Sequence, residues 1–95
     1  MEKDIREIAE HYGYDSQMNQ LIEECAELIQ AVNKLRRAQT DKETAVALDN
    51  LVEEIADVEL MIAQLKYLYV VTDAEIDAMK LYKINRTKER IRNSN

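Results

Sequence analysis

The sequence contains no proline, tryptophan or phenylalanine, and its 95 residues include one glycine, Gly13. Glycine and proline build most tight turns, and aromatic residues are enriched in strands, so their scarcity argues against a sheet with tight turns. Apolar residues make up 46% of the chain and charged residues 34%. This composition favours long helices.

The single cysteine, Cys25, excludes an internal disulfide. The sequence shows neither a signal peptide nor an apolar run of membrane-spanning length. We therefore expect a cytoplasmic protein with no membrane partner, because reducing compartments keep thiols free.

Charge is distributed unevenly along the chain. Up to Met79, acidic residues outnumber basic residues 18 to 7, whereas the remaining residues include 6 basic and 1 acidic, within a net charge of −6. An acidic body repels a nucleic-acid backbone, so we expect no nucleic acid polymer as a partner. The basic segment, if it lies beside a metal site, could receive a polyphosphate.

Apolar spacing predicts four helices. The first covers residues 2–12 and ends at Gly13. The second begins with Asp15 or Ser16 as its cap and ends at a basic cluster, which suits the helix dipole. The residues of that cluster are Lys34, Arg36 and Arg37. Its predicted apolar stripe is Met18, Leu21, Ile22, Cys25, Leu28, Ile29, Val32 and Leu35.

The third predicted helix covers residues 42–70, and the fourth covers 74–91 after a cap at Thr72 or Asp73. The third has an apolar stripe of Leu48, Leu51, Val52, Ile55, Val58, Ile62 and Leu65. The fourth is expected to turn Ile76, Met79, Ile84 and Ile91 inward.

Three further apolar residues of the third helix, Leu60, Met61 and Leu68, lie outside its stripe, on the side nearer Glu54 and Asp57. A helix that is apolar on two sides is usually covered on both, and a chain this short is marginally stable alone. We therefore expect another subunit to supply the second cover. The predicted fold is an all-α, four-helix bundle-like protomer in one domain, residues 1–95, that forms a homodimer or homotetramer through its long helices.

Two acidic motifs, Glu23-Glu24-Cys25-Ala26-Glu27 and Glu53-Glu54-Ile55-Ala56-Asp57, lie within the second and third predicted helices. Residues three apart share one helix surface, so Glu24 pairs with Glu27, and Glu54 with Asp57. Two such pairs on packed helices would make an oxygen-only site, which suits Mg²⁺. The four side chains flank the apolar stripes, as at the rim of a groove.

The motif Glu-Glu-x-x-Glu, followed after 26 residues by Glu-x-x-Asp, resembles that of the MazG-type all-α nucleoside triphosphate pyrophosphohydrolases. The resemblance covers about residues 18–90 and implies a helical enzyme that binds Mg²⁺, or alternatively Mn²⁺, through Glu24, Glu27, Glu54 and Asp57. Glu23 matches the leading family glutamate, which implies a role in positioning water or a ligand. Ala56 stands where the second motif often has glycine.

The resemblance implies hydrolysis of a nucleoside triphosphate between its α and β phosphates, giving a monophosphate and pyrophosphate. The base is either a carboxylate of the site or a hydroxide on the metal, and the sequence leaves both open. Family members carry a Lys/Asn/Arg cluster that contacts the phosphates, and it is matched here by Lys83, Asn85, Arg86 and Lys88. Gln20, one turn before Glu24 on the same flank, is a further candidate, either to bind a phosphate of the substrate or to bond a ligand carboxylate.

The acidic residues raise two other interpretations. A non-catalytic helical oligomerisation or interaction module would use the same acidic residues only for solubility. A di-iron carboxylate bundle would need Glu-x-x-His motifs on facing helices, and the single histidine, His11, lies far from both acidic motifs.

Overall fold

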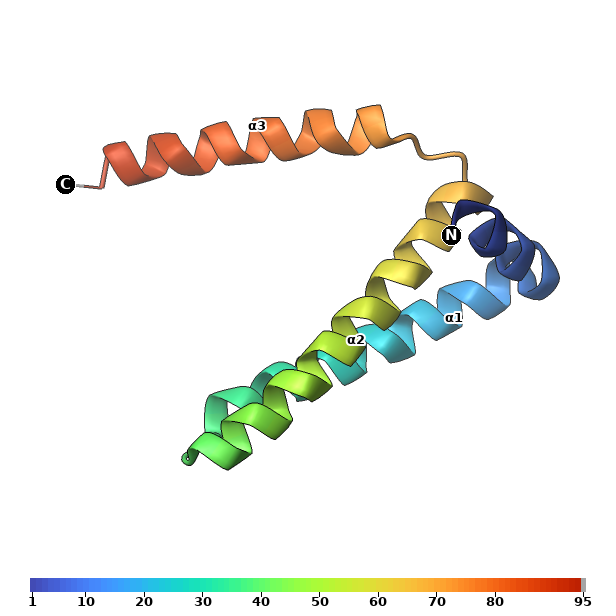
Figure 1. Cartoon of the computed structure of the whole chain (residues 1–95). Coiled ribbons are helices and arrows are strands. Elements are labelled where there is room, and N and C mark those ends of the chain that lie inside the picture. Colours follow the sequence, from blue (N-terminus) through green and yellow to red (C-terminus); the bar gives the residue numbers. More distant parts are fainter. Residues whose placement is uncertain (95) are drawn as a thin grey trace.

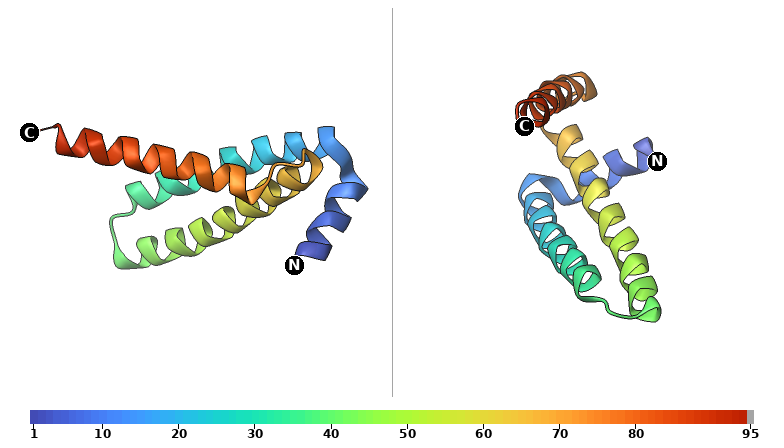
Figure 2. Two further views of the ribbon diagram at one scale, coloured as in Figure 1. Left: turned by 90° about the horizontal axis from the view of Figure 1, so that it is seen from above. Right: turned by 90° about the vertical axis from the view of Figure 1, so that its left-hand side faces the viewer.

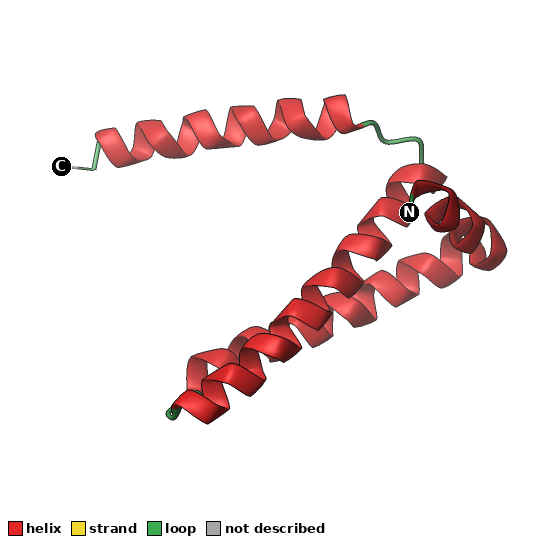
Figure 3. Ribbon diagram, in the orientation of Figure 1, coloured by secondary structure: helices red, strands yellow, loops and turns green. Residues whose placement is uncertain are grey.

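A computed structural model describes residues 1–94 and contains three helices: α1 (Glu2–Arg37), α2 (Asp41–Leu68) and α3 (Asp73–Arg92). No strand occurs within this described range (Figure 3). The all-α prediction is confirmed. The prediction of four helices is wrong, because the first two predicted helices are continuous in α1. None of the three helices combines the length and apolarity that a membrane span requires.

α1 bends at Gly13, where φ is 82° and ψ is −178°. This positive φ is one that glycine adopts without steric cost. A Cβ added here would meet no atom within 4 Å, so the backbone conformation requires glycine and the surrounding space does not. The predicted helix end at Gly13 is therefore present as a kink, after which α1 continues.

Capping boxes begin both later helices. The backbone N–H of Glu43 donates to Thr40 Oγ1 at 3.1 Å, and the backbone N–H of Thr40 donates to Glu43 Oε1 at 3.1 Å. Thr72 and Glu75 make the same reciprocal pair at the start of α3, which confirms the predicted cap. Each box satisfies N–H groups that the first helical turn leaves without partners.

α1 and α2 run antiparallel and form a hairpin that closes at residues 38–40 (Figure 1). The part of α1 before the kink crosses the other end of α2, where the Tyr67 hydroxyl donates to Glu10 and Arg6 lies over the Tyr67 ring. α3 leaves this open end and packs against neither α1 nor α2 (Figures 1 and 2).

The contact between α1 and α2 buries few and mostly small residues. The buried apolar residues are Ala9, Ala31, Ala47, Val58 and Met61. Gln17 and Gln64 are also buried, and Gln17 Nε2 donates a hydrogen bond to Gln64 Oε1. Met61 is expected to meet another subunit, but it is only 6% exposed within this chain, whereas Leu60 from the same expected side is 45% exposed. That expectation is wrong for Met61.

The predicted apolar stripes are divided between this contact and the surface. Val58 is buried, and the half-buried stripe residues are Met18, Leu21, Cys25, Leu28, Leu35, Leu51 and Leu65. Ile22 on α1 and Val52 on α2 are each 67% exposed. Further exposed stripe residues are Ile29, Val32, Leu48, Ile55 and Ile62. On α3, the residues Met79, Ile84 and Ile91 are exposed and not inward, because no part of the described chain packs on this helix. Periodicity therefore identified which residues share a face, and the hairpin buries one part of each predicted face and leaves the other part exposed.

Candidate metal centre

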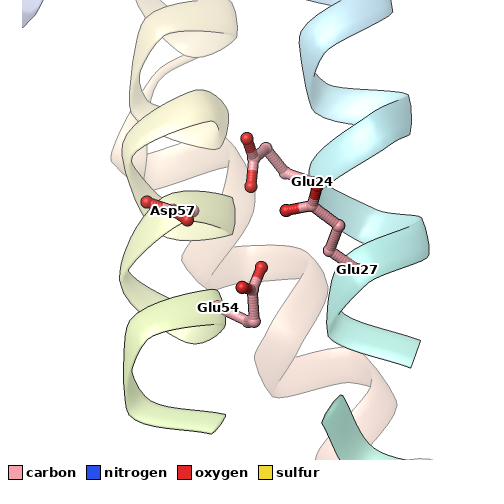
Figure 4. Close-up of side chains that lie close together, drawn as sticks. All are labelled: Glu24, Glu27, Glu54 and Asp57. Carbon is pink, nitrogen blue, oxygen red and sulfur yellow. The ribbon is translucent and has the colours of Figure 1, made fainter. Parts of the chain in front are cut away.

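Four carboxylates meet across the hairpin, Glu24 and Glu27 from α1 and Glu54 and Asp57 from α2 (Figure 4). One ligand oxygen from each lies within 4.8 Å of the others. The helices run in opposite directions, so two pairs with three-residue spacing face each other at the same level. We call these four residues the carboxylate cluster.

Two oxygens of the cluster are buried without a hydrogen-bond partner in the described residues, Glu24 Oε2 and Glu54 Oε2. The side chains of Glu24, Glu54 and Asp57 are half-buried, while Glu27 is exposed. A buried carboxylate oxygen without a partner is unfavourable, because it has lost water and gained nothing in exchange. A cation between the two helices would remove this cost.

The four charges also repel one another. The neighbouring Glu54 carboxylate raises the pKa of Glu27, first through its charge and then through a shared hydrogen bond. Partial burial raises the pKa of Asp57, and the charge of Glu24 acts in the same direction. Glu27 and Asp57 therefore hold protons more readily than isolated carboxylates do, and a bound cation would displace these protons.

The donor set fits a hard divalent cation. All four side chains offer oxygen, and Mg²⁺ prefers carboxylate oxygens while keeping other positions for water or substrate phosphates. No histidine or cysteine belongs to the cluster, so it lacks the ligands typical of zinc or copper sites. The unpartnered oxygens of Glu24 and Glu54 are the observation that supports this fit.

Comparison with protein families agrees with this site. A family model described as the MazG nucleotide pyrophosphohydrolase domain matches residues 13–89. The chain belongs to the MazG family. The matched segment of this MazG domain begins at the kink in α1 and includes both acidic motifs. Comparisons with curated proteins and with solved structures gave no match.

Gln20 is held against the cluster of the MazG domain. Its Nε2 donates a hydrogen bond to Glu24 Oε1 at 2.7 Å. Glu24 therefore has one oxygen fixed by Gln20 and the other, Oε2, without a partner. In this structure the Gln20 amide contacts a carboxylate of the cluster, on the same helix one turn away.

The other predicted site residues are not members of the cluster. Glu23 is exposed on α1 and is not among the four converging carboxylates. The predicted phosphate-binding residues are all exposed on α3, which packs against neither helix of the hairpin. These are Lys83, Asn85, Arg86 and Lys88. Within one chain, the structure does not bring them to the cluster, and their role stays a prediction.

Sequence reasoning missed the Gln17–Gln64 pair, which extends the polar contact of the hairpin beyond the cluster. Gln17 lies seven residues before Glu24, and Gln64 lies seven residues after Asp57. Seven residues are about two helical turns, so both glutamines fall on the helix faces that carry the cluster. The seven-residue spacing from the acidic motifs is the sequence signal from which this pair could have been predicted.

Proposed function

We propose that this MazG domain, as one helical domain, is a Mg²⁺-dependent nucleoside triphosphate pyrophosphohydrolase. It cleaves a ribo- or deoxyribonucleoside triphosphate between the α and β phosphates and releases a monophosphate and pyrophosphate. The observation that carries the proposal is the convergence of Glu24, Glu27, Glu54 and Asp57 in a family whose description names this activity.

In this proposal the carboxylate cluster holds Mg²⁺, with Mn²⁺ as an alternative. The bound ion supplies neutralisation of phosphate charge and Lewis acidity at the reacting phosphorus. Gln20 fixes Glu24 Oε1, and the unpartnered Oε2 would be free to hold the ion. A carboxylate at the cluster would accept a proton from the attacking water. Glu23, exposed beside Glu24, orients that water.

The phosphates also need cationic and hydrogen-bonding partners, and we assign this role to Lys83, Asn85, Arg86 and Lys88. Because α3 packs on no other helix of its own chain, these side chains reach a cluster only if α3 closes onto a hairpin. We place this contact in a homodimer or homotetramer, where α3 covers the exposed apolar residues of a second copy. Exposed Ile22 and Val52 on the hairpin, and exposed Met79 and Ile84 on α3, support that arrangement.

The test is pyrophosphate release from each of the eight canonical ribo- and deoxyribonucleoside triphosphates, with and without Mg²⁺. The Glu54→Gln variant removes one charge from the cluster and should lower the rate by at least about 100-fold, because metal-ion stabilisation of the transition state is worth several kcal/mol. Glu59→Gln, an exposed carboxylate of α2 outside the cluster, is the matched control and should retain the wild-type rate.

The alternative function is a non-catalytic helical interaction module, and the unpartnered α3 with its exposed apolar residues favours it. The two functions give different results in the same assay. The enzyme proposal fails if no nucleotide yields pyrophosphate and Glu54→Gln changes neither metal binding nor melting temperature. The interaction module is then the better description.

A further inference from the structure

A cavity of about 610 Å³ lies at the closed end of the hairpin. Figure 1 shows this end, where α1 ends and α2 begins. Its walls include Lys34, Arg37, Lys42, Val46, Ala47 and Asn50, and we call it the turn cavity. None of the four residues of the carboxylate cluster lines it. Its volume is in the range of small-molecule sites.

The turn cavity is positively charged within an acidic part of the chain. Up to Met79 there are 7 basic residues against 18 acidic ones, and Lys34, Arg37 and Lys42 of the cavity wall are among those 7. None of these three cations forms an ion pair within residues 1–94. The one carboxylate in the wall, Glu43, already accepts hydrogen bonds from the backbone N–H groups of Gln39 and Thr40.

The helix dipoles explain only part of this charge. Lys34 and Arg37 lie in the last turn of α1, where a cation is favoured by the dipole. Lys42 lies in the first turn of α2, where the dipole disfavours a cation. An anion bound in the cavity would stabilise the positive charges of all three side chains.

The cavity also has an apolar wall. Val46 is 64% exposed and Ala47 is buried beneath it. A site with several cations on one side and an exposed aliphatic surface on the other suits a ligand with a charged end and a flat or apolar end. Lysine and arginine together are the side chains that most often bind phosphate groups.

We propose that the turn cavity is a second binding site of this chain, for a phosphate-bearing anion, and that it works without a metal ion. Lys34, Arg37 and Lys42 contact the phosphate oxygens, and Val46 contacts any nucleoside attached to them. The site differs in this respect from the carboxylate cluster, whose negative charges would repel a phosphate unless a divalent cation lay between them.

Because only the carboxylate cluster requires a divalent cation to bind phosphate, removal of such cations tests the turn cavity separately. Binding of inorganic pyrophosphate to the full chain is measured by calorimetry in EDTA, where the carboxylate cluster has no divalent ion to hold a phosphate. The wild type and the Glu54→Gln variant should bind with the same affinity. The Lys34→Ala/Lys42→Ala double variant should bind at least tenfold more weakly. Both lysines are exposed, so their removal leaves the fold intact.

A matched control removes two exposed lysines elsewhere, as Lys3→Ala/Lys80→Ala, and should bind pyrophosphate as the wild type does. Equal loss in both double variants would mean attraction by overall charge alone and would overturn the proposal. Absence of binding to the wild type in EDTA, or loss confined to a Lys83→Ala/Lys88→Ala variant, would also overturn it. Neither result would affect pyrophosphate release in the presence of Mg²⁺, so the enzyme proposal is tested separately.

A second titration identifies the source of the phosphate. If a nucleoside diphosphate binds more tightly than pyrophosphate and Val46→Ser removes the difference, the site takes a nucleotide. If both bind equally, it takes inorganic pyrophosphate. Either outcome supports a phosphate site at the turn cavity.

Discussion

The hairpin and α3 are built from similar amphipathic sequence, but the helices of the hairpin pack against each other and α3 packs against no other helix. α1 and α2 cover each other and place half-buried polar groups between them, whereas α3 exposes both its apolar and its basic residues. Apolar spacing is sufficient to make a helix, but a helix is buried only where a second surface meets it. The hairpin has that surface within the chain, and α3 has to find it elsewhere.

The largest expected effect concerns the missing partner of α3. The Met79→Glu/Ile84→Glu variant should weaken self-association at least about 100-fold, because burying two such side chains is worth roughly 3–6 kcal/mol. Light scattering at micromolar concentration measures the change in mass. Ala78→Glu, an exposed residue next to Met79, is the control and should keep the wild-type mass. A wild-type monomer at this concentration would contradict the oligomer proposal.

The next largest expected effect is the stabilisation of the hairpin by Mg²⁺. Mg²⁺ at one hundred times its Kd should raise the free energy of unfolding by about 2.7 kcal/mol, because the ion binds only the folded cluster. Asp57→Asn should lose most of this gain, and Glu59→Gln should keep it. Thermal unfolding with and without Mg²⁺ gives the comparison. An equal shift in the Asp57→Asn variant would place the ion elsewhere.

The Gln17–Gln64 hydrogen bond tests how the hairpin tolerates a polar contact. Gln64→Ala leaves the buried Gln17 amide without its partner and should cost about 1–3 kcal/mol in urea unfolding. The Gln17→Leu/Gln64→Leu variant removes both amides and should cost less than Gln64→Ala. If the double variant is the less stable one, the glutamine pair stabilises the hairpin beyond satisfying its own polar groups.

The corner between the hairpin and α3 contains one strained residue. Val70 has a φ of 55° and is 80% exposed, so its conformation is unfavourable for a β-branched residue and its side chain packs little. Val70→Gly should therefore stabilise the protein by up to about 1 kcal/mol. Val71→Gly, next to it and without a positive φ, is the control and should destabilise it. Calorimetry distinguishes the two variants.

The smallest expected effect is the pH dependence of the metal-free protein. The pKa values of Glu27 and Asp57 are raised in the folded state, so this state binds more protons than the unfolded one as pH rises above the ordinary values of 4.5 and 3.8. The contribution of these two groups to stability therefore falls as pH rises through that window.

Glu54→Gln removes the main cause of the shift at Glu27 and should flatten this dependence. The capping residues Glu43 and Glu75 have lowered pKa values and contribute in the opposite direction, but equally in both proteins. The comparison of wild type with Glu54→Gln therefore isolates the cluster. A steeper loss of stability with rising pH in Glu54→Gln would contradict the repulsion described here.

Much of the site could be predicted from the sequence because its geometry is local. Residues three apart on a helix share a surface whatever the helix packs against, so the pairs Glu24–Glu27 and Glu54–Asp57 followed from spacing. Their meeting across the hairpin required only that α1 and α2 be neighbours. The Gln20 contact with Glu24 is equally local, at one helical turn.

The less local features were predicted poorly. The third predicted helix was assigned one inward side by its stripe, but α2 turns Met61 toward α1 and leaves Val52 exposed. The last helix was expected to bury Ile84, which has no partner in this chain. The turn cavity combines residues from the end of α1 and the start of α2, and no single stretch of sequence reveals it.

The sequence by itself determined the helical segments, the cap at Thr72, the break at Gly13 and the pairing of acids on each helix, because these depend on interactions within a few residues. Only the tertiary structure decided which helix face is buried, since two apolar sides of one helix compete for a single neighbour. It also decided that the carboxylates converge while α3 stays apart, because convergence depends on the packing of distant segments.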